Sequence, residues 1–260
     1  MLEVKNLSTH FYLEEKEVKA VDKVSISVGR GEILGIVGES GSGKSTVALS
    51  IMRLVSSPGK IVSGEINFDD QDLLKLSEAE MIKIRGARIS MIFQDPFTSL
   101  NPVYTVGDQI AEAIQLHQEV NRKEAWQRAI AMLETVHIKD PTERIKDYPH
   151  QFSGGMRQRV MIAMAVACQP EILIADEPTT ALDVTIQAEI LKLLREMREK
   201  FNLSIIYITH NFGIIKQICD RVVVMYQGKV VEEGITRQII ESPGNAYTKR
   251  LIGCLKELKV

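Results

Sequence analysis

Residues 38–45, GESGSGKS, place a lysine and a serine directly after a glycine-rich stretch. The spacing GxxxxGKS lets successive backbone N–H groups converge on phosphate oxygens. Lys44 could then reach the β- and γ-phosphates of a nucleoside triphosphate, and the Ser45 hydroxyl could ligate Mg²⁺. An apolar run precedes the stretch and a helical pattern follows it, so the positive end of a helix dipole would face the phosphates. The pattern predicts a triphosphate-binding loop rather than an ordinary glycine-rich turn.

Two adjacent carboxylates, Asp176 and Glu177, follow the apolar run Ile172–Ala175. Ligands of α/β sheets bind at the carboxyl ends of the strands, where both side chains would emerge. Asp176 would hold Mg²⁺ directly or through water. Glu177 would polarise the water that attacks the γ-phosphate, because phosphoryl transfer depends chiefly on orienting the nucleophile and stabilising charge. Alone, the pair could be a solvated strand end; beside the phosphate loop it predicts a hydrolytic site.

The elements that must position these groups alternate between strand and helix patterns. Continuous apolar runs rich in β-branched residues occur at Glu32–Val37, Ile89–Phe93, Ile172–Ala175, Ser204–Thr209 and Arg221–Tyr226. Such runs indicate strands buried on both faces. Helical spacing occurs between them, at Thr46–Leu54, Arg157–Ala167 and Ile186–Phe201. The sequence therefore predicts an α/β fold with a mostly parallel sheet.

Two regions depart from this alternation. Early segments with a strand pattern, Leu2–Leu7, Val24–Val28 and Gly64–Phe68, predict a small antiparallel sheet. From about residue 96 to residue 151 the β-rich character disappears, and Val106–Leu116 and Lys123–Val136 have helical spacing, with Pro141 and Pro149 as breaks. This stretch is a candidate helical subdomain inserted into the core. Residues 225–229 predict a hairpin.

The composition limits the function classes. The chain has 260 residues, 45% of them hydrophobic, which suffices for one large domain or a domain with a subdomain. A formal net charge of −2 gives no basic field for nucleic acid. No apolar run approaches the roughly 20 residues that cross a bilayer, so any membrane role would require a partner. Cys168, Cys219 and Cys254 lack metal-ligand spacing, and we expect reduced thiols, as in the cytosol.

Further motifs follow one another in a set order: Gln94 after a strand-like run, FSGGM at 152–156, ALD at 181–183, and His210 after another strand-like run. With the phosphate loop, this order resembles the nucleotide-binding subunits of ABC transporters over nearly the whole chain. The resemblance implies a Q-loop at Gln94, the signature segment (normally LSGGQ), a D-loop and a switch histidine. Alone, the SGG segment could be a loop and His210 a core or surface histidine.

The resemblance also implies a domain organisation. A P-loop NTPase (RecA-like) core with an antiparallel β subdomain is expected at 1–95 and 166–235, a helical signature subdomain at 96–165, and a short helical tail at 236–260.

The family's functional residues can be carried over by position. The expected nucleotide contacts are Phe11, Gly38, Ser40, Gly41, Ser42, Gly43, Lys44, Ser45, Thr46, Ser153, Gly154, Gly155 and Asp183. The expected metal ligands are Ser45, Gln94 and Asp176, and the expected catalytic groups are Glu177, His210 and Gln94. Phe11, or else Tyr12, could stack on the adenine; the alternative is a simple core aromatic.

A second anion site is expected at Ser153 and the amides of Gly154 and Gly155, at the start of a helix. In the family this segment closes over ATP held by a partner subunit, which gives a head-to-tail dimer. Met156 replaces the usual glutamine and Asn211 follows the switch histidine where many relatives have aspartate. Neither change removes a catalytic group, so we expect an active ATPase.

Further sequence features favour one branch of this family. Residues 89–102 and 148–185 closely resemble peptide and nickel importers, and Asn245–Lys249 resembles the branch's HPYTK segment without the His-Pro pair. The sequence stops at Val260, which fits a short nickel-type subunit or a chain cut short, and we expect no iron–sulfur cluster in these residues.

The resemblance therefore implies an ATP-binding and ATP-hydrolysing importer subunit at the cytoplasmic face of the cell membrane. Its cofactors would be ATP and Mg²⁺. Its partners would be a second ATP-binding subunit, transmembrane permease subunits and, indirectly, an extracytoplasmic substrate-binding protein, with no nucleic acid. The alternatives are a soluble non-transport ABC ATPase and a low-activity member of a heterodimer; the sequence specifies neither the cargo nor the dimer type.

Overall fold

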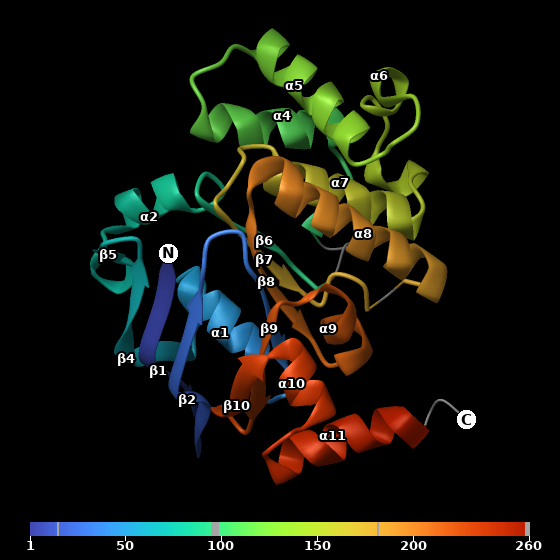
Figure 1. Cartoon of the computed structure of the whole chain (residues 1–260). Coiled ribbons are helices and arrows are strands. Elements are labelled where there is room, and N and C mark those ends of the chain that lie inside the picture. The colour runs from blue at the N-terminus through green and yellow to red at the C-terminus, as the bar shows by residue number, and fades with distance from the viewer. Residues whose placement is uncertain (15, 95–98, 181, 258–260) are drawn as a thin grey trace. The chain divides into compact units, whose positions relative to one another are not determined.

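The structure is a computed structural model that describes residues 1–14, 16–94, 99–180 and 182–257, with side chains to residue 253 (Figure 1). These residues form two compact units. The first contains Met1–Met81 and Ser204–Val260, and the second contains Ile82–Leu203. None of the described helices is long and apolar enough to span a bilayer.

The first unit contains the predicted antiparallel sheet. Its strands are β1 (Leu2–Leu13), β2 (Lys16–Val28), β4 (Gly59–Phe68) and the short β5 (Gln71–Asp72), in the order β2-β1-β4-β5. The strands extend further than the sequence pattern indicated, because their outer ends are half-exposed and carry polar residues that hide the periodicity.

The same unit contains the strands that flank the phosphate loop. Strand β3 (Ile33–Val37) pairs in parallel with β8 (Ser204–Thr209) and β9 (Arg221–Tyr226), and β10 (Lys229–Ile235) returns antiparallel to β9. All five residues of β3 are buried, as the continuous apolar pattern predicted. The unit's helices are α1 (Lys44–Ile51), α9 (Phe212–Ile218), α10 (Thr236–Glu241) and α11 (Ala246–Glu257), with a 3₁₀ turn at Leu73–Lys75. Helix α2 (Glu78–Ile84) leads into the second unit.

The second unit contains two parallel strands, β6 (Ile89–Ile92) and β7 (Ile172–Asp176). Between them the chain forms the helices α4 (Val106–His117), α5 (Arg122–Thr135), α6 (Pro141–Arg144) and α7 (Gly154–Val166), with a 3₁₀ turn at Pro149–Gln151. Helix α8 (Val184–Phe201) follows β7. Helix α5 packs on α4 and α7, and α7 packs on α8. The predicted helical stretch is confirmed among the described residues; its exact domain boundaries stay a prediction.

Helix α7 starts at Gly154, which agrees with the helix start expected at Ser153 and lies before the helical spacing seen from Arg157 onwards. Ser153 caps its N-terminus and compensates for two residues with poor helix propensity. Pro141 and Pro149 do not merely break helices. Each lies at the start of a short helical turn. A backbone N–H has no partner within the helix at that position, so the missing N–H of proline costs no hydrogen bond.

Candidate functional site

Residues 38–43 join β3 to α1 in a turn that only glycine fits easily. Gly41 and Gly43 have φ angles of +76° and +101°. A Cβ atom on Gly43 would lie 2.2 Å from the carbonyl oxygen of Ala20 in β2, and one on Gly38 would lie 2.2 Å from that of Met225 in β9. The loop is therefore enclosed by backbone on both sides, and the glycines provide the space.

Lys44 lies over this loop. Its Nζ atom donates hydrogen bonds to the carbonyl oxygens of Gly38 and Glu39, both at 2.9 Å, and its side chain is buried. The Ser42 hydroxyl is also buried and has no hydrogen-bond partner among the described residues. Ser45 and Thr46 lie in the first turn of α1. A buried hydroxyl without a partner is unfavourable, and a phosphate oxygen is the kind of acceptor that would satisfy it.

The two predicted carboxylates lie at the carboxyl end of β7. Asp176 is 5% exposed and ends the strand, and Glu177 follows with a φ of +45°. This left-handed backbone costs about 1–2 kcal/mol for a residue other than glycine, and such strain is concentrated at functional sites. The Glu177 carboxylate accepts hydrogen bonds from the Thr180 hydroxyl at 2.8 Å and from Nε2 of Gln94 at 3.4 Å. The structure thus brings Gln94 and Glu177 together.

His210 follows β8 and is exposed. Its neighbour Asn211 caps α9, because the Asn211 side chain accepts a hydrogen bond from the Gly213 amide at 2.8 Å. Asparagine and aspartate cap helices about equally well. The departure from aspartate therefore leaves this turn intact.

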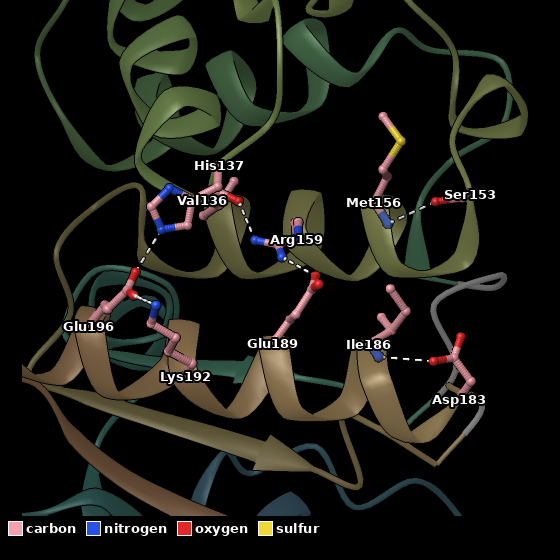
Figure 2. Close-up of polar contacts among 10 residues, drawn as sticks. All are labelled: Val136, His137, Ser153, Met156, Arg159, Asp183, Ile186, Glu189, Lys192 and Glu196. Carbon is pink, nitrogen blue, oxygen red and sulfur yellow. Dashed lines mark hydrogen bonds and ion pairs between the residues drawn. The ribbon is translucent and has the colours of Figure 1, made fainter.

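The signature and D-loop segments both begin helices (Figure 2). Ser153 is exposed and its Oγ atom accepts a hydrogen bond from the Met156 amide at 3.3 Å, at the start of α7. Asp183 accepts a hydrogen bond from the Ile186 amide at 2.9 Å, at the start of α8. Ala181, the first residue of the predicted D-loop, lies outside the described residues. Since Ser153 caps α7, it is held at the site of the helix dipole's positive end.

Arg159 connects the signature helix to two other elements, and sequence reasoning missed it. Its guanidinium donates to the carbonyl oxygen of Val136, after α5, at 3.0 Å and to Glu189 of α8 at 2.8 Å (Figure 2). Nearby, a Cβ atom on Gly155 would lie 2.6 Å from Ile186, so α7 and α8 approach closely there. An arginine on an otherwise buried helix face was the available signal.

Phe11 lies on β1 with its ring against the backbone of Gly59, where a Cβ atom would be 2.7 Å from the ring. Tyr12 is 47% exposed. Stacking of either ring on an adenine stays a prediction.

The predicted residues fall into two groups. The first unit contains Phe11, residues 38–46 and His210, and the second contains Gln94, Asp176, Glu177, residues 153–155 and Asp183. Within each group the elements present the side chains as described above. Their convergence around one nucleotide stays a prediction.

Comparisons with known proteins agree with the resemblance to ABC transporter subunits. A family model described as ABC transporter matches residues 21–180. The dipeptide transport ATP-binding protein DppD of Escherichia coli is 52% identical over 257 residues, 99% of this chain and 79% of that protein. The oligopeptide transport ATP-binding protein AppD of Bacillus subtilis is 51% identical over 97% of this chain and 77% of its own. A solved dimer of an ATP-binding cassette in a post-hydrolysis state, bound to ADP and Pi, has a TM-score of 0.81 and 29% identity, covering 91% of this chain and 99% of that one.

Proposed function

This chain belongs to the ABC transporter family and hydrolyses ATP, and we propose that it powers the uptake of peptides, or of nickel, through a separate membrane permease. The relatives named for dipeptide and oligopeptide transport, about half identical over nearly the whole chain, support peptides as the first cargo to test. The single observation that carries the site is the phosphate loop between β3 and α1.

The loop's own geometry fits a triphosphate. Its glycines let the loop lie directly against the backbone of β2 and β9, the buried Ser42 hydroxyl has no partner among the described residues, and Lys44 is already directed over the loop. Phosphate oxygens would accept hydrogen bonds from Ser42, Lys44 and the first amides of α1. Mg²⁺, held by Ser45, Gln94 and Asp176, would neutralise charge that develops on the phosphates.

Glu177 is the group that orients the attacking water. Its carboxylate is held by Thr180 and Gln94, so its acceptor oxygens have a defined direction. Catalysis of phosphoryl transfer consists almost entirely of positioning and charge stabilisation, and Glu177 supplies the positioning of the attacking water. His210 assists at the γ-phosphate.

Ser153, with the amides of Gly154 and Gly155, completes the nucleotide site of a second subunit. The exposed position of Ser153 at the start of α7 supports a contact outside this chain. ATP then binds the closed dimer more tightly than the open one, and hydrolysis releases the two subunits.

A cavity of about 520 Å³ between β6, α4 and α7 supports contact with a permease. Its lining is largely apolar and includes Met91, Phe93, Ala113 and Met161. Burial lowers the pKa of His117 there, which favours the neutral imidazole. An apolar helix end from the permease would fill this cavity beside Gln94, at the cytoplasmic face of the membrane, with a substrate-binding protein acting on the other side.

The test is Glu177→Gln, which keeps the shape of the side chain and removes its charge. Turnover of ATP should fall by about 100-fold or more, since an oriented general base contributes roughly that factor. With ATP, the variant should elute as a dimer in size-exclusion chromatography. Glu134→Gln on the exposed face of α5 is the control and should behave as wild type. Unchanged turnover in Glu177→Gln would contradict the assignment.

Cargo is tested in cells that contain the permease and binding protein. Uptake of labelled dipeptide that depends on Lys44 supports peptide import. Lys44-dependent uptake of labelled Ni²⁺ without peptide uptake would assign the chain to nickel.

A further inference from the structure

Helix α11 contacts the phosphate loop, although the two are far apart in the sequence. The Tyr247 hydroxyl accepts a hydrogen bond from the backbone N–H of Glu39 at 3.2 Å. The Arg250 guanidinium lies 3.8 Å from the Glu39 carboxylate and 5.4 Å from the centre of the Tyr247 ring. Glu39 is the second residue of the phosphate loop, so α11 holds the loop close to its start.

Tyr247 is fixed from several directions. It is 8% exposed, and its ring lies 4.2 Å from the ring of Tyr226 at the end of β9. Its amide donates to the side chain of Asn245 at 2.8 Å, and the amides of Gly244 and Asn245 donate to Glu232 of β10 at 2.6 and 3.2 Å. Burial raises the pKa of the Tyr247 hydroxyl, so it stays protonated at neutral pH. These contacts give the hydroxyl one position.

The bond to Glu39 bears directly on Lys44 through one peptide group. The amide of Glu39 and the carbonyl of Gly38 belong to the same peptide plane, and they point in opposite directions because that peptide is trans. Lys44 donates to the carbonyl of Gly38 at 2.9 Å, on the edge opposite Tyr247. A rigid plane held at one edge by Tyr247 therefore presents a fixed acceptor to Lys44 at the other.

We propose that Tyr247 is a positioning residue for the nucleotide: its hydroxyl fixes the peptide between Gly38 and Glu39, and thereby the direction of Lys44. The inference rests on the proposed phosphate site. It extends that site to α11, whose first turn belongs to the Asn245–Lys249 segment and to none of the motifs expected to contact nucleotide. Loss of the Tyr247 hydroxyl should weaken nucleotide binding more than it slows the hydrolytic step. The reason is that Tyr247 acts on the binding loop and not on Glu177.

The test compares two variants that each remove one hydroxyl from the same stacked pair. Tyr247→Phe removes the bond to Glu39, whereas Tyr226→Phe removes a hydroxyl whose partner among the described residues is the Gln227 side chain. Binding of a fluorescent ATP analogue to the full chain should weaken about three- to tenfold in Tyr247→Phe, as expected for one hydrogen bond. The KM for ATP should rise by a similar factor with kcat within about twofold. Tyr226→Phe should match wild type in both measurements.

Hydrogen exchange provides a second readout that does not depend on activity. The peptide containing Glu39 should exchange faster in Tyr247→Phe than in wild type or Tyr226→Phe. Equal affinity and equal exchange in the two variants would overturn the inference. Lys44→Ala separates this failure from that of the proposed site: if Lys44→Ala also binds the analogue normally, the phosphate site itself is misassigned.

Discussion

Gly41 and Gly43 have similar backbone requirements but different surroundings. Both have positive φ angles, +76° and +101°. A Cβ atom on Gly41 would meet nothing within 4 Å, whereas one on Gly43 would lie 2.2 Å from the carbonyl oxygen of Ala20. The first glycine is needed for its conformation alone, and the second for both conformation and space.

The two alanine variants should therefore differ. Gly41→Ala should lower the free energy of unfolding by about 1–2 kcal/mol, the cost of a left-handed alanine. Gly43→Ala should lower it further and abolish ATP binding, because β2 or the loop must move. Urea unfolding and binding of a fluorescent ATP analogue measure the two effects. Equal losses in the two variants would show that the approach of Ala20 does not limit the loop.

At the scale of elements, the helices that follow the signature segment and the D-loop each begin with a side-chain cap. Ser153 caps α7 and Asp183 caps α8, and the two helices pack where Gly155 meets Ile186. Arg159, whose side chain is 14% exposed, then joins α7 to Glu189 of α8 and to the carbonyl of Val136. The signature segment and the D-loop are thus attached to one connected pair of helices.

Arg159→Met tests this connection. The variant keeps much of the side-chain length but leaves the carbonyl of Val136 without this donor, so the free energy of unfolding should fall by about 1–3 kcal/mol. Arg237→Met is the matched control, since Arg237 is exposed on α10 and, among the described residues, its ion pair is with Glu241 four residues on. Its loss should stay below about 0.5 kcal/mol. Urea denaturation of both variants measures the free energy of unfolding. If Arg159→Met loses no more of it than the control does, the Arg159 contacts do not stabilise the packing of these helices.

At the scale of the whole molecule, the proposed head-to-tail dimer makes a prediction that a site within one chain does not. Lys44→Ala disables a subunit's own phosphate loop, and Ser153→Glu places a negative charge where the partner's nucleotide would bind. Each variant alone should have no ATP turnover, as both of its dimer sites are defective. In a mixed dimer, one of the two sites has an intact Lys44 and an intact Ser153.

Mixing the two purified variants should therefore restore turnover that neither has alone. ATPase rate against mixing ratio is the measurement, and a maximum near equal amounts is expected. Mixing Lys44→Ala with Glu177→Gln is the control, because those two residues are predicted to serve the same nucleotide. No recovery in the first mixture would contradict a site shared between subunits.

Features that depend on neighbouring residues in the chain could be predicted without the structure. The spacing of residues 38–45 requires the glycine turn that the structure contains, and five continuous apolar runs became buried strands because that pattern reports burial directly. The order of the motifs indicated the family before any fold was known. Helical spacing alone missed the first turn of α7, which begins at Gly154, where the Ser153 cap outweighs weak helix propensity.

Contacts between residues far apart in the chain could not be predicted and became visible in the folded structure. Tyr247 reaches Glu39 across 208 positions, and Arg159 reaches Val136 and Glu189 from a different helix. Periodicity reports which face of an element is buried, but it does not report what that face contacts. Those partners depend on strand order and helix packing, which the whole chain determines together.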